Sequence, residues 1–238
     1  MALVGVSSKS ISGFDPRSVI PGCSLWLDAA DSSTLTLSGS NVIQWNDKSG
    51  NGNHALNGNT TVTYSSNSVT IAAGSSLSIS KLVSSLVNTP FVYFVVEQNY
   101  TNLGSFLTDN SGQPGSTNAL LAMGYRSSTD IMFQFYSNDL DITTGFSGYP
   151  YNTRIWAFTV NSSNNRSIRL NGTVLGSDGN TSGLSRFYSP SILGGTYYEC
   201  ILYIGTTYTT TQIQQVEGYL AGKWGLSLIH ISEPTRPY

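Results

Sequence analysis

Charged residues are scarce in this chain. They make up 10% of its 238 residues, and the formal net charge is −2. Nucleic acids and anionic membranes bind proteins through a concentrated basic surface, whereas the few Lys and Arg residues here are scattered along the sequence. We therefore expect neither of them as a main partner.

Long apolar runs are missing as well. No stretch approaches the roughly 20 apolar residues that a membrane-spanning helix needs. The apolar run Ala2–Val6 is too short for a secretory signal, and no basic residue precedes it. The sequence therefore indicates neither a membrane span nor a signal peptide.

Cysteine occurs only twice, as Cys23 and Cys200. The first and last strands of a β-sandwich are often neighbours, so a disulfide between them is geometrically conceivable. Nothing else in the sequence points to an oxidising compartment. We therefore favour two buried free thiols.

Residues for catalysis are also few. The two histidines are His54, inside an Asn/Gly-rich turn, and His230, in an atypical tail, so no nucleophilic triad is indicated. Glycoside hydrolysis needs two carboxylates on either side of a sugar. Asp139 and Asp141 are the only acidic pair at strand spacing, and a solvated strand end or turn explains them.

Two glutamates in predicted strands, Glu97 and Glu199, have no acidic partner at alternate positions. One carboxyl of raised pKa without a second does not complete a glycosidase. We therefore predict that the protein is not an enzyme.

The abundant residues indicate β-structure. Apolar residues make up 39% of the chain, and Ser, Thr, Asn and Gly fill most of the remainder. Short alternating or β-branched segments recur between turn signals, which is typical of a sandwich or barrel. Strands are expected near 23–28, 42–45, 61–64, 68–72, 77–80, 91–96, 104–108, 119–125, 131–136, 154–160, 190–194 and 199–204, with a hairpin over 168–175 that turns at Asn171-Gly172.

The most apolar segment is Phe91–Val96, whose six consecutive apolar residues predict a central strand covered on both faces. One helix is expected, from N-cap hydroxyls at 209–211 to a stop at Gly225. Its apolar face comprises Ile213, Val216, Leu220 and Trp224. We expect this helix to pack across an end or edge of the sandwich.

The stretch Trp45–Ala55 is dense in Asn and Gly, residues that tolerate positive φ, and this predicts a compact turn. Its structural residues are Trp45, Asp47, Gly50 and Gly52. Asp47 is placed to accept hydrogen bonds from the backbone of the turn. Asp47, Asn51 and Asn53 also offer the oxygen ligands that Ca²⁺ accepts, so a calcium site is the alternative to a purely structural turn.

A second loop, Gly145–Tyr151, presents aromatic rings between glycines and a proline. Phe146, Tyr149 and Tyr151 are the candidates for stacking on a sugar ring, with Tyr125 as a further candidate and Tyr197 and Tyr198 as secondary ones. Partly buried packing residues are the alternative explanation for rings in such a Tyr-rich chain.

Three motifs together carry a family resemblance. Leu25–Ala29, Trp45–Ala55 and Val216–Gly225 occur in an order that resembles the laminin-G-like branch of the concanavalin A-like lectin/glucanase superfamily. This resemblance implies an all-β fold: a two-sheet antiparallel jelly-roll sandwich with one short C-terminal helix. It covers residues 23–226, after an N-terminal arm of residues 1–22.

The superfamily resemblance leaves several functions open. We predict a non-catalytic recognition or display module that binds glycans or protein surfaces, in a virion or an extracellular setting. A polysaccharide-cleaving glycoside hydrolase and a purely structural capsid or fibre protein are the alternatives.

Residues 227–238 do not follow the pattern of the rest. Their sequence resembles the translation of a sequencing adapter, so we expect a non-native tail and a missing native C-terminus. His230 is therefore left out of the site reasoning.

Overall fold

The computed structural model describes residues 14–58, 60–98, 104–112, 115–145, 152–179, 182–205 and 207–228. The strands are β1 (Cys23–Asp28), β2 (Leu35–Ser38), β3 (Asn41–Trp45), β4 (Ala55–Asn57), β5 (Val62–Ser65), β6 (Ser68–Ser78), β7 (Phe91–Gln98), β8 (Ser105–Asp109), β9 (Ala122–Tyr125), β10 (Asp130–Gln134), β11 (Asp139–Thr143), β12 (Arg154–Val160), β13 (Arg166–Leu170), β14 (Thr173–Asp178) and β15 (Pro190–Ile204). The helices are α1 (Pro16–Val19) and α2 (Thr210–Trp224), and short 3-10 turns cover Ser32–Thr34 and Ser80–Leu82.

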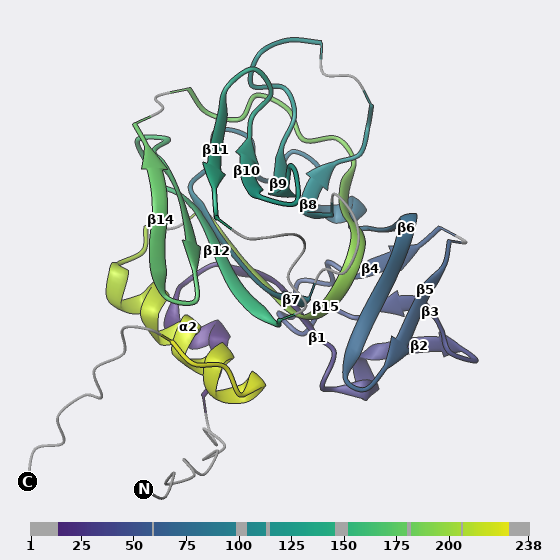
Figure 1. Cartoon of the computed structure of the whole chain (residues 1–238). Helices are drawn as coiled ribbons and strands as arrows, with labels where there is room; N and C mark the ends of the chain where they lie inside the picture. The colour runs from purple at the N-terminus through teal and green to yellow at the C-terminus, as the bar shows by residue number, and fades with distance from the viewer. Residues whose placement is uncertain are drawn as a thin grey trace, which may run out of the picture.

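The strands form an antiparallel sandwich whose two layers share one long strand, β15. The C-terminal half of β15 lies between β1 and β7, and the layer continues through β12 and β13 to β14. Its N-terminal half pairs with β8 and β6, which lead to β9–β11 on one side and to β2–β5 on the other. In Figure 1, β8–β11 lie side by side, and β12 and β14 lie next to them.

The layers enclose the main core. The strand predicted to be central, β7, is buried along Phe91–Val96 on both faces, and each of these six residues has an exposed fraction of 0%. Tyr93 and Val95 face the main core with Phe106, while Phe94 faces a second core under α2. The prediction of a doubly covered strand is confirmed.

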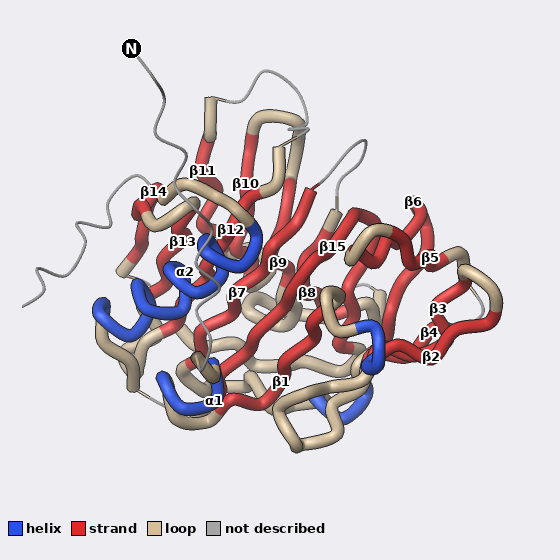
Figure 2. Tube along the Cα trace, turned by 90° about the horizontal axis from the view of Figure 1, so that it is seen from below, coloured by secondary structure: helices blue, strands red, loops and turns tan. Residues whose placement is uncertain are grey.

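Helix α2 begins and ends as the sequence predicts. Thr209 and Gln212 form a reciprocal capping box, and Gly225 closes the helix with a φ of 65°. Its position differs from the expectation: α2 lies across the outer face of β7 and β12 (Figure 2), not at an end or edge. A buried ion pair of 2.7 Å between Arg169 of β13 and Glu217 of α2 holds it there.

Several strand predictions need correction. The segments 68–72 and 77–80 belong to one strand, β6, and 190–194 and 199–204 belong to β15, because both strands continue through irregular, glycine-containing stretches. Strands β2 and β4 are short and were not expected, and β11 is a regular strand where a strand end or turn is predicted. The hairpin turn is confirmed, since Asn171 and Gly172 both have positive φ.

The end of the N-terminal arm is part of the packed domain. Ile20 is fully buried, the ring of Phe14 stacks on Tyr219 at 4.7 Å, and the hydroxyl of Tyr203 donates to the Pro16 carbonyl at 2.9 Å. The described part of the arm therefore continues into the second core.

Strands β1 and β15 are neighbours, as expected for the first and last strands. Cys23 lies opposite Tyr203 and Cys200 opposite Leu27, and both thiols are free. Cys200 is buried, whereas Cys23 is half-buried. Among the described residues, no helix has the length and apolar character that crossing a membrane requires.

Candidate functional site

The Asn/Gly-rich turn after β3 is organised by Asp47. Its Oδ1 accepts the N–H groups of Trp26 and Ser49, both at 2.8 Å. Its Oδ2 accepts the Asn53 N–H at 2.9 Å and the Ser49 hydroxyl at 2.7 Å. Three of these four hydrogen bonds hold the turn together, and the fourth, from Trp26, ties it to β1.

The amide side chains of the turn extend this attachment. Asn51 donates to the Cys23 carbonyl at 2.8 Å, and Asn53 donates to the Ser24 carbonyl at 2.5 Å. Nδ1 of His54 accepts the backbone N–H at position 47 at 3.0 Å, which gives this histidine a structural partner. The turn thus packs its polar groups against β1.

The hydrogen bonds account for the turn without a metal, and the calcium site stays a prediction. Both oxygens of Asp47 accept protein donors, and the amide nitrogens of Asn51 and Asn53 donate to carbonyls of β1. The nearby Asp28 and Asp31 both bind Lys48. Within the described ranges, no group of three or more His, Cys, Asp or Glu residues is placed to hold a metal.

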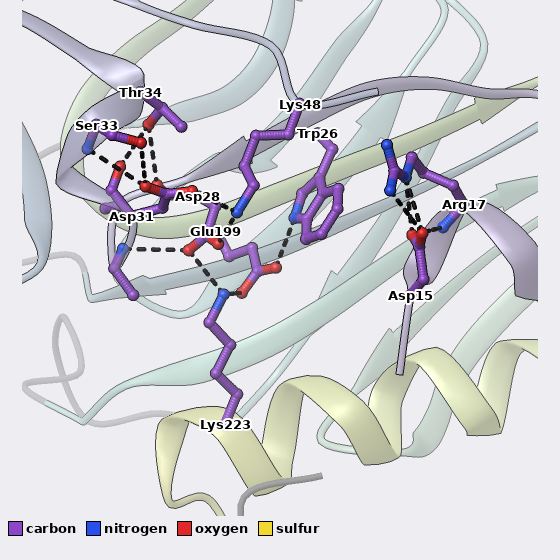
Figure 3. Close-up of polar contacts among 12 residues, drawn as sticks. Asp15, Arg17, Trp26, Asp28, Asp31, Ser33, Thr34, Lys48, Glu199 and Lys223 are labelled. Carbon is purple, nitrogen blue, oxygen red and sulfur yellow. Dashed lines mark hydrogen bonds and ion pairs between the residues drawn. The ribbon is translucent and has the colours of Figure 1, made fainter. Parts of the chain in front are cut away.

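Next to the turn, a buried glutamate accepts from four donors, and Figure 3 shows two of them, Trp26 and Lys223. Glu199 of β15 has an exposed fraction of 0%. Its Oε1 accepts from Trp26 Nε1 at 2.8 Å and from the Tyr219 hydroxyl at 2.9 Å. Its Oε2 accepts from Trp224 Nε1 and Lys223 Nζ, both at 2.8 Å. Burial raises the pKa of Glu199, and the Lys223 charge opposes that rise.

A second buried carboxylate, Asp28, shares the same lysine. Its oxygens lie 2.7 Å from Lys223 Nζ and 2.8 Å from Lys48 Nζ, and Lys48 also contacts Asp31 at 2.9 Å. We call Trp26, Asp28, Lys48, Glu199, Tyr219, Lys223 and Trp224 the polar network. All residues of this network except Glu199 belong to the three sequence motifs. Glu199, which binds residues of the first and third motifs, lies outside all of them.

A third buried carboxylate lies at the end of β7. Glu97 is 1% exposed, and its Oε1 accepts from the Tyr125 hydroxyl at 2.9 Å and from Trp156 Nε1 at 2.8 Å. Its Oε2 has no hydrogen-bond partner among the described residues. Burial raises the pKa of Glu97 to about 7, against the opposing effects of Trp156, Tyr125 and the Arg154 charge.

The residues predicted to stack on a sugar do not form one surface among the described residues. Tyr125 is 1% exposed and belongs to the main core, so its ring is not presented at the surface as predicted, because its hydroxyl is bound to Glu97. Tyr197 is also buried, and its hydroxyl donates to the Leu193 carbonyl at 2.6 Å. The other three candidates, Phe146, Tyr149 and Tyr151, lie outside the described residues.

The acidic pair of β11 is engaged on the surface. Asp139 and Asp141 contact one guanidinium, that of Arg126, at 2.7 Å each. Both carboxylates thus serve an ion pair between strands, consistent with the non-catalytic explanation of this pair.

An open groove lies where β6 departs from β15. Leu193 pairs with Ser76 and Gly195 with Ile71, so residues 72–75 of β6 have no strand partner and bulge out opposite Gly194. The groove has a volume of about 390 Å³ and is lined by residues 73–76 and 193–194 and by Asn110. A glycine within a predicted strand segment is the sequence signal for such a bulge.

Comparisons with known proteins show a widespread fold. No protein-family model and no curated protein sequence matches the chain. Solved structures do match, several of them at 10–16% sequence identity. At such identities the likeness concerns the fold alone, a mostly antiparallel β-sandwich with one C-terminal helix.

Three of these structures illustrate the likeness. Domain 4 of AbnA, an extracellular arabinanase of Geobacillus stearothermophilus solved with arabinotriose, has a TM-score of 0.59 at 15% identity, over 82% of this chain and 98% of that one. A botulinum neurotoxin type C structure, described as depending on two ganglioside molecules for cell entry, has a TM-score of 0.58 at 13% identity, over 84% of this chain and 51% of that one. The CBM40 of a Ruminococcus gnavus sialidase, bound to α2,3-sialyllactose, has a TM-score of 0.51 at 10% identity, over 63% and 96%.

Proposed function

We propose that the protein is a non-catalytic module that binds glycans. The observation that carries this proposal is the likeness to domain 4 of the arabinanase, which includes 98% of that domain and was seen in a complex with arabinotriose. The ganglioside-dependent toxin and the sialyllactose-binding CBM40 have the same fold and bind other sugars. The fold is thus used for glycan recognition in proteins of different origin.

The state of the carboxylates supports a binding role over hydrolysis. A glycosidase needs an acid and a second carboxylate that both reach the sugar. Glu199 and Asp28 share Lys223 but are 0% and 4% exposed, and Glu97 lies beneath Tyr125 and Trp156. These carboxylates hold protein groups together and are closed to a substrate.

The same comparisons and the motifs support a proposal for the setting of the module. We assign it to the laminin-G-like branch on the three motifs, and to an extracellular or virion surface, where glycans and protein partners are presented. The arabinanase is itself an extracellular protein.

A glycan array probed with the purified protein tests the proposal. Retention of at least one oligosaccharide class is expected, together with no release of reducing ends from a panel of polysaccharides. An array without any retained glycan would contradict the binding role. Release that Glu97→Gln or Glu199→Gln abolishes would establish the hydrolase alternative.

A further inference from the structure

We infer that the groove beside the β6 bulge is a binding site for a neutral saccharide. This inference rests on the proposed glycan-binding function and assigns it a place on the molecule. The site consists of residues 73–76 of β6, residues 193–194 of β15 and Asn110 after β8. Its volume of about 390 Å³ lies in the range of ~300–1,000 Å³ that small-molecule sites occupy.

The bulge supplies main-chain groups for a ligand. Residues 72–75 have no partner in the ladders of β15, β5 or β4. The bulge is anchored from its other side, where the Ala72 N–H donates to the Thr61 carbonyl at 3.0 Å and the Ser75 hydroxyl accepts the Thr61 N–H at 3.1 Å. The exposed Ala73 and Gly74 between these anchors lie at the groove.

Two polar side chains of the lining are available as well. The Asn110 amide and the Ser76 hydroxyl make no hydrogen bond to any described residue, although the backbone N–H of Asn110 is bound to the Ser189 carbonyl at 2.9 Å. An amide, a hydroxyl and main-chain groups offer donors and acceptors together, as sugar hydroxyls require. None of the seven lining residues is charged, and the nearby Arg186 guanidinium lies 4.0 Å from the Asp109 carboxylate, so we favour a neutral saccharide over a sialylated one.

An exposed aromatic residue, Tyr188, has its backbone held close to Asn110 of this lining. Tyr188 precedes Ser189, and both N–H groups are held by the carboxylate of Asp109, at 3.0 and 3.1 Å. The Tyr188 side chain is 58% exposed, and the Arg186 guanidinium lies 4.9 Å from its ring centroid. We include Tyr188 in the proposed site, because an exposed ring on a backbone held near Asn110 offers a flat apolar face to the C–H groups of a pyranose or furanose.

Two variants and two matched controls test the site. Ala73→Trp fills the groove and Tyr188→Ala removes the ring, and both positions are exposed. Ser177→Trp and Val174→Ala make changes of the same kinds at exposed positions of β14. Each protein is titrated calorimetrically with the neutral oligosaccharide that the wild type retains best on an array of neutral and sialylated glycans.

We expect Ala73→Trp to weaken binding by about tenfold or more, since it occupies the space of the ligand. We expect Tyr188→Ala to weaken it by about three- to tenfold, the effect of one lost ring contact. Both controls should bind within about twofold of the wild type, and all four melting temperatures should match it.

The possible results distinguish a wrong binding site from a wrong function. Retention of glycans by the wild type with unchanged affinity in Ala73→Trp and Tyr188→Ala overturns the groove and leaves the proposed function intact. Retention of sialylated glycans alone overturns the neutral ligand class. An array with no retained glycan overturns the function on which the inference rests.

Discussion

Two polar regions of this molecule differ in how their hydrogen-bonding groups are used. In the polar network, Glu199 accepts four bonds and Asp28 contacts two lysines. In the groove, residues 72–75 have no strand partner, and the side chains of Ser76 and Asn110 bind no described residue. The network is saturated and buried, whereas the groove is open to a ligand.

This contrast distinguishes polar groups that stabilise the fold from polar groups that are available to a ligand. The network joins β1, β15, α2 and the Asp47 turn, which are far apart in sequence, so its residues are needed to close the domain. The groove is lined by three segments, residues 73–76, residues 193–194 and Asn110. Its polar groups are not needed to hold these segments together. We therefore expect changes in the network to alter stability, and changes at the groove to alter binding.

The largest stability effect is expected from Glu199→Ala. It leaves the indole N–H of Trp26, the Tyr219 hydroxyl and the Lys223 ammonium without their buried acceptor. Removing one partner of a buried ion pair costs about 3–5 kcal/mol of unfolding free energy. Urea denaturation measures this loss.

The matched control is Asp141→Ala. Its carboxylate pairs with Arg126 on the surface and is 43% exposed, so a loss of about 0–1 kcal/mol is expected. Equal effects of the two variants would contradict a structural role for the network.

A smaller, pH-dependent effect is expected from Glu97. Its pKa is raised from 4.5 to about 7 in the folded protein, so its contribution to stability is complete below about pH 4.5 and is lost as the pH rises through 7. The groups that face it are Tyr125, Trp156, Arg154 and Tyr197.

Glu97→Gln removes this titration. The fall in unfolding free energy from pH 5 to pH 8 should shrink by on the order of 3 kcal/mol in this variant. Titration of Glu199 is common to both proteins and cancels in the comparison. An identical pH dependence in wild type and variant would show that the Glu97 carboxyl titrates normally.

The Asp47 turn should respond more modestly. Asp47→Ala leaves the N–H groups of Trp26, Ser49 and Asn53 without their acceptor, which costs about 1–3 kcal/mol. Chelator should leave the melting temperature of the wild type unchanged. A drop with chelator that calcium reverses would replace the structural explanation of the turn with a metal site.

The smallest effect is expected at the C-terminus. Leu228 packs half-buried against the second core, close to Gly172, so truncations before and after it test the predicted boundary at residue 226. Truncation after Leu226 should cost about 1 kcal/mol, whereas truncation after Leu228 should leave the unfolding free energy unchanged. Equal stability of both truncated proteins would support the predicted domain boundary at residue 226.

The elements that the sequence predicts well are those defined by local pattern. Phe91–Val96 is a run of apolar residues, and the helix from Thr210 to Gly225 has caps and a periodic face, so both were predictable from neighbouring residues alone. Strand β4 contains only three residues, too few for a pattern to emerge, whereas β2 alternates apolar and polar residues over Leu35–Ser38 and was predictable.

The candidate sites depend on contacts that local pattern does not contain. Trp26 and Glu199 are 173 positions apart, and their hydrogen bond arises only when β1 pairs with β15. The groove arises from a change of register between Leu193 and Gly195, which composition does not specify. Tyr125 ends a strand that the sequence predicts, but the face on which its ring lies depends on the pairing with β10, which turns the ring into the main core.

The most direct test of this contrast is a map of amide chemical shifts as the wild type is titrated with its tightest-binding glycan. Our account predicts that the shifts concentrate on residues 73–76, 110, 188 and 193–194, while the amides of Trp26, Asp28 and Glu199 keep their positions. Shifts centred on the polar network, with residues 73–76 unmoved, would contradict it.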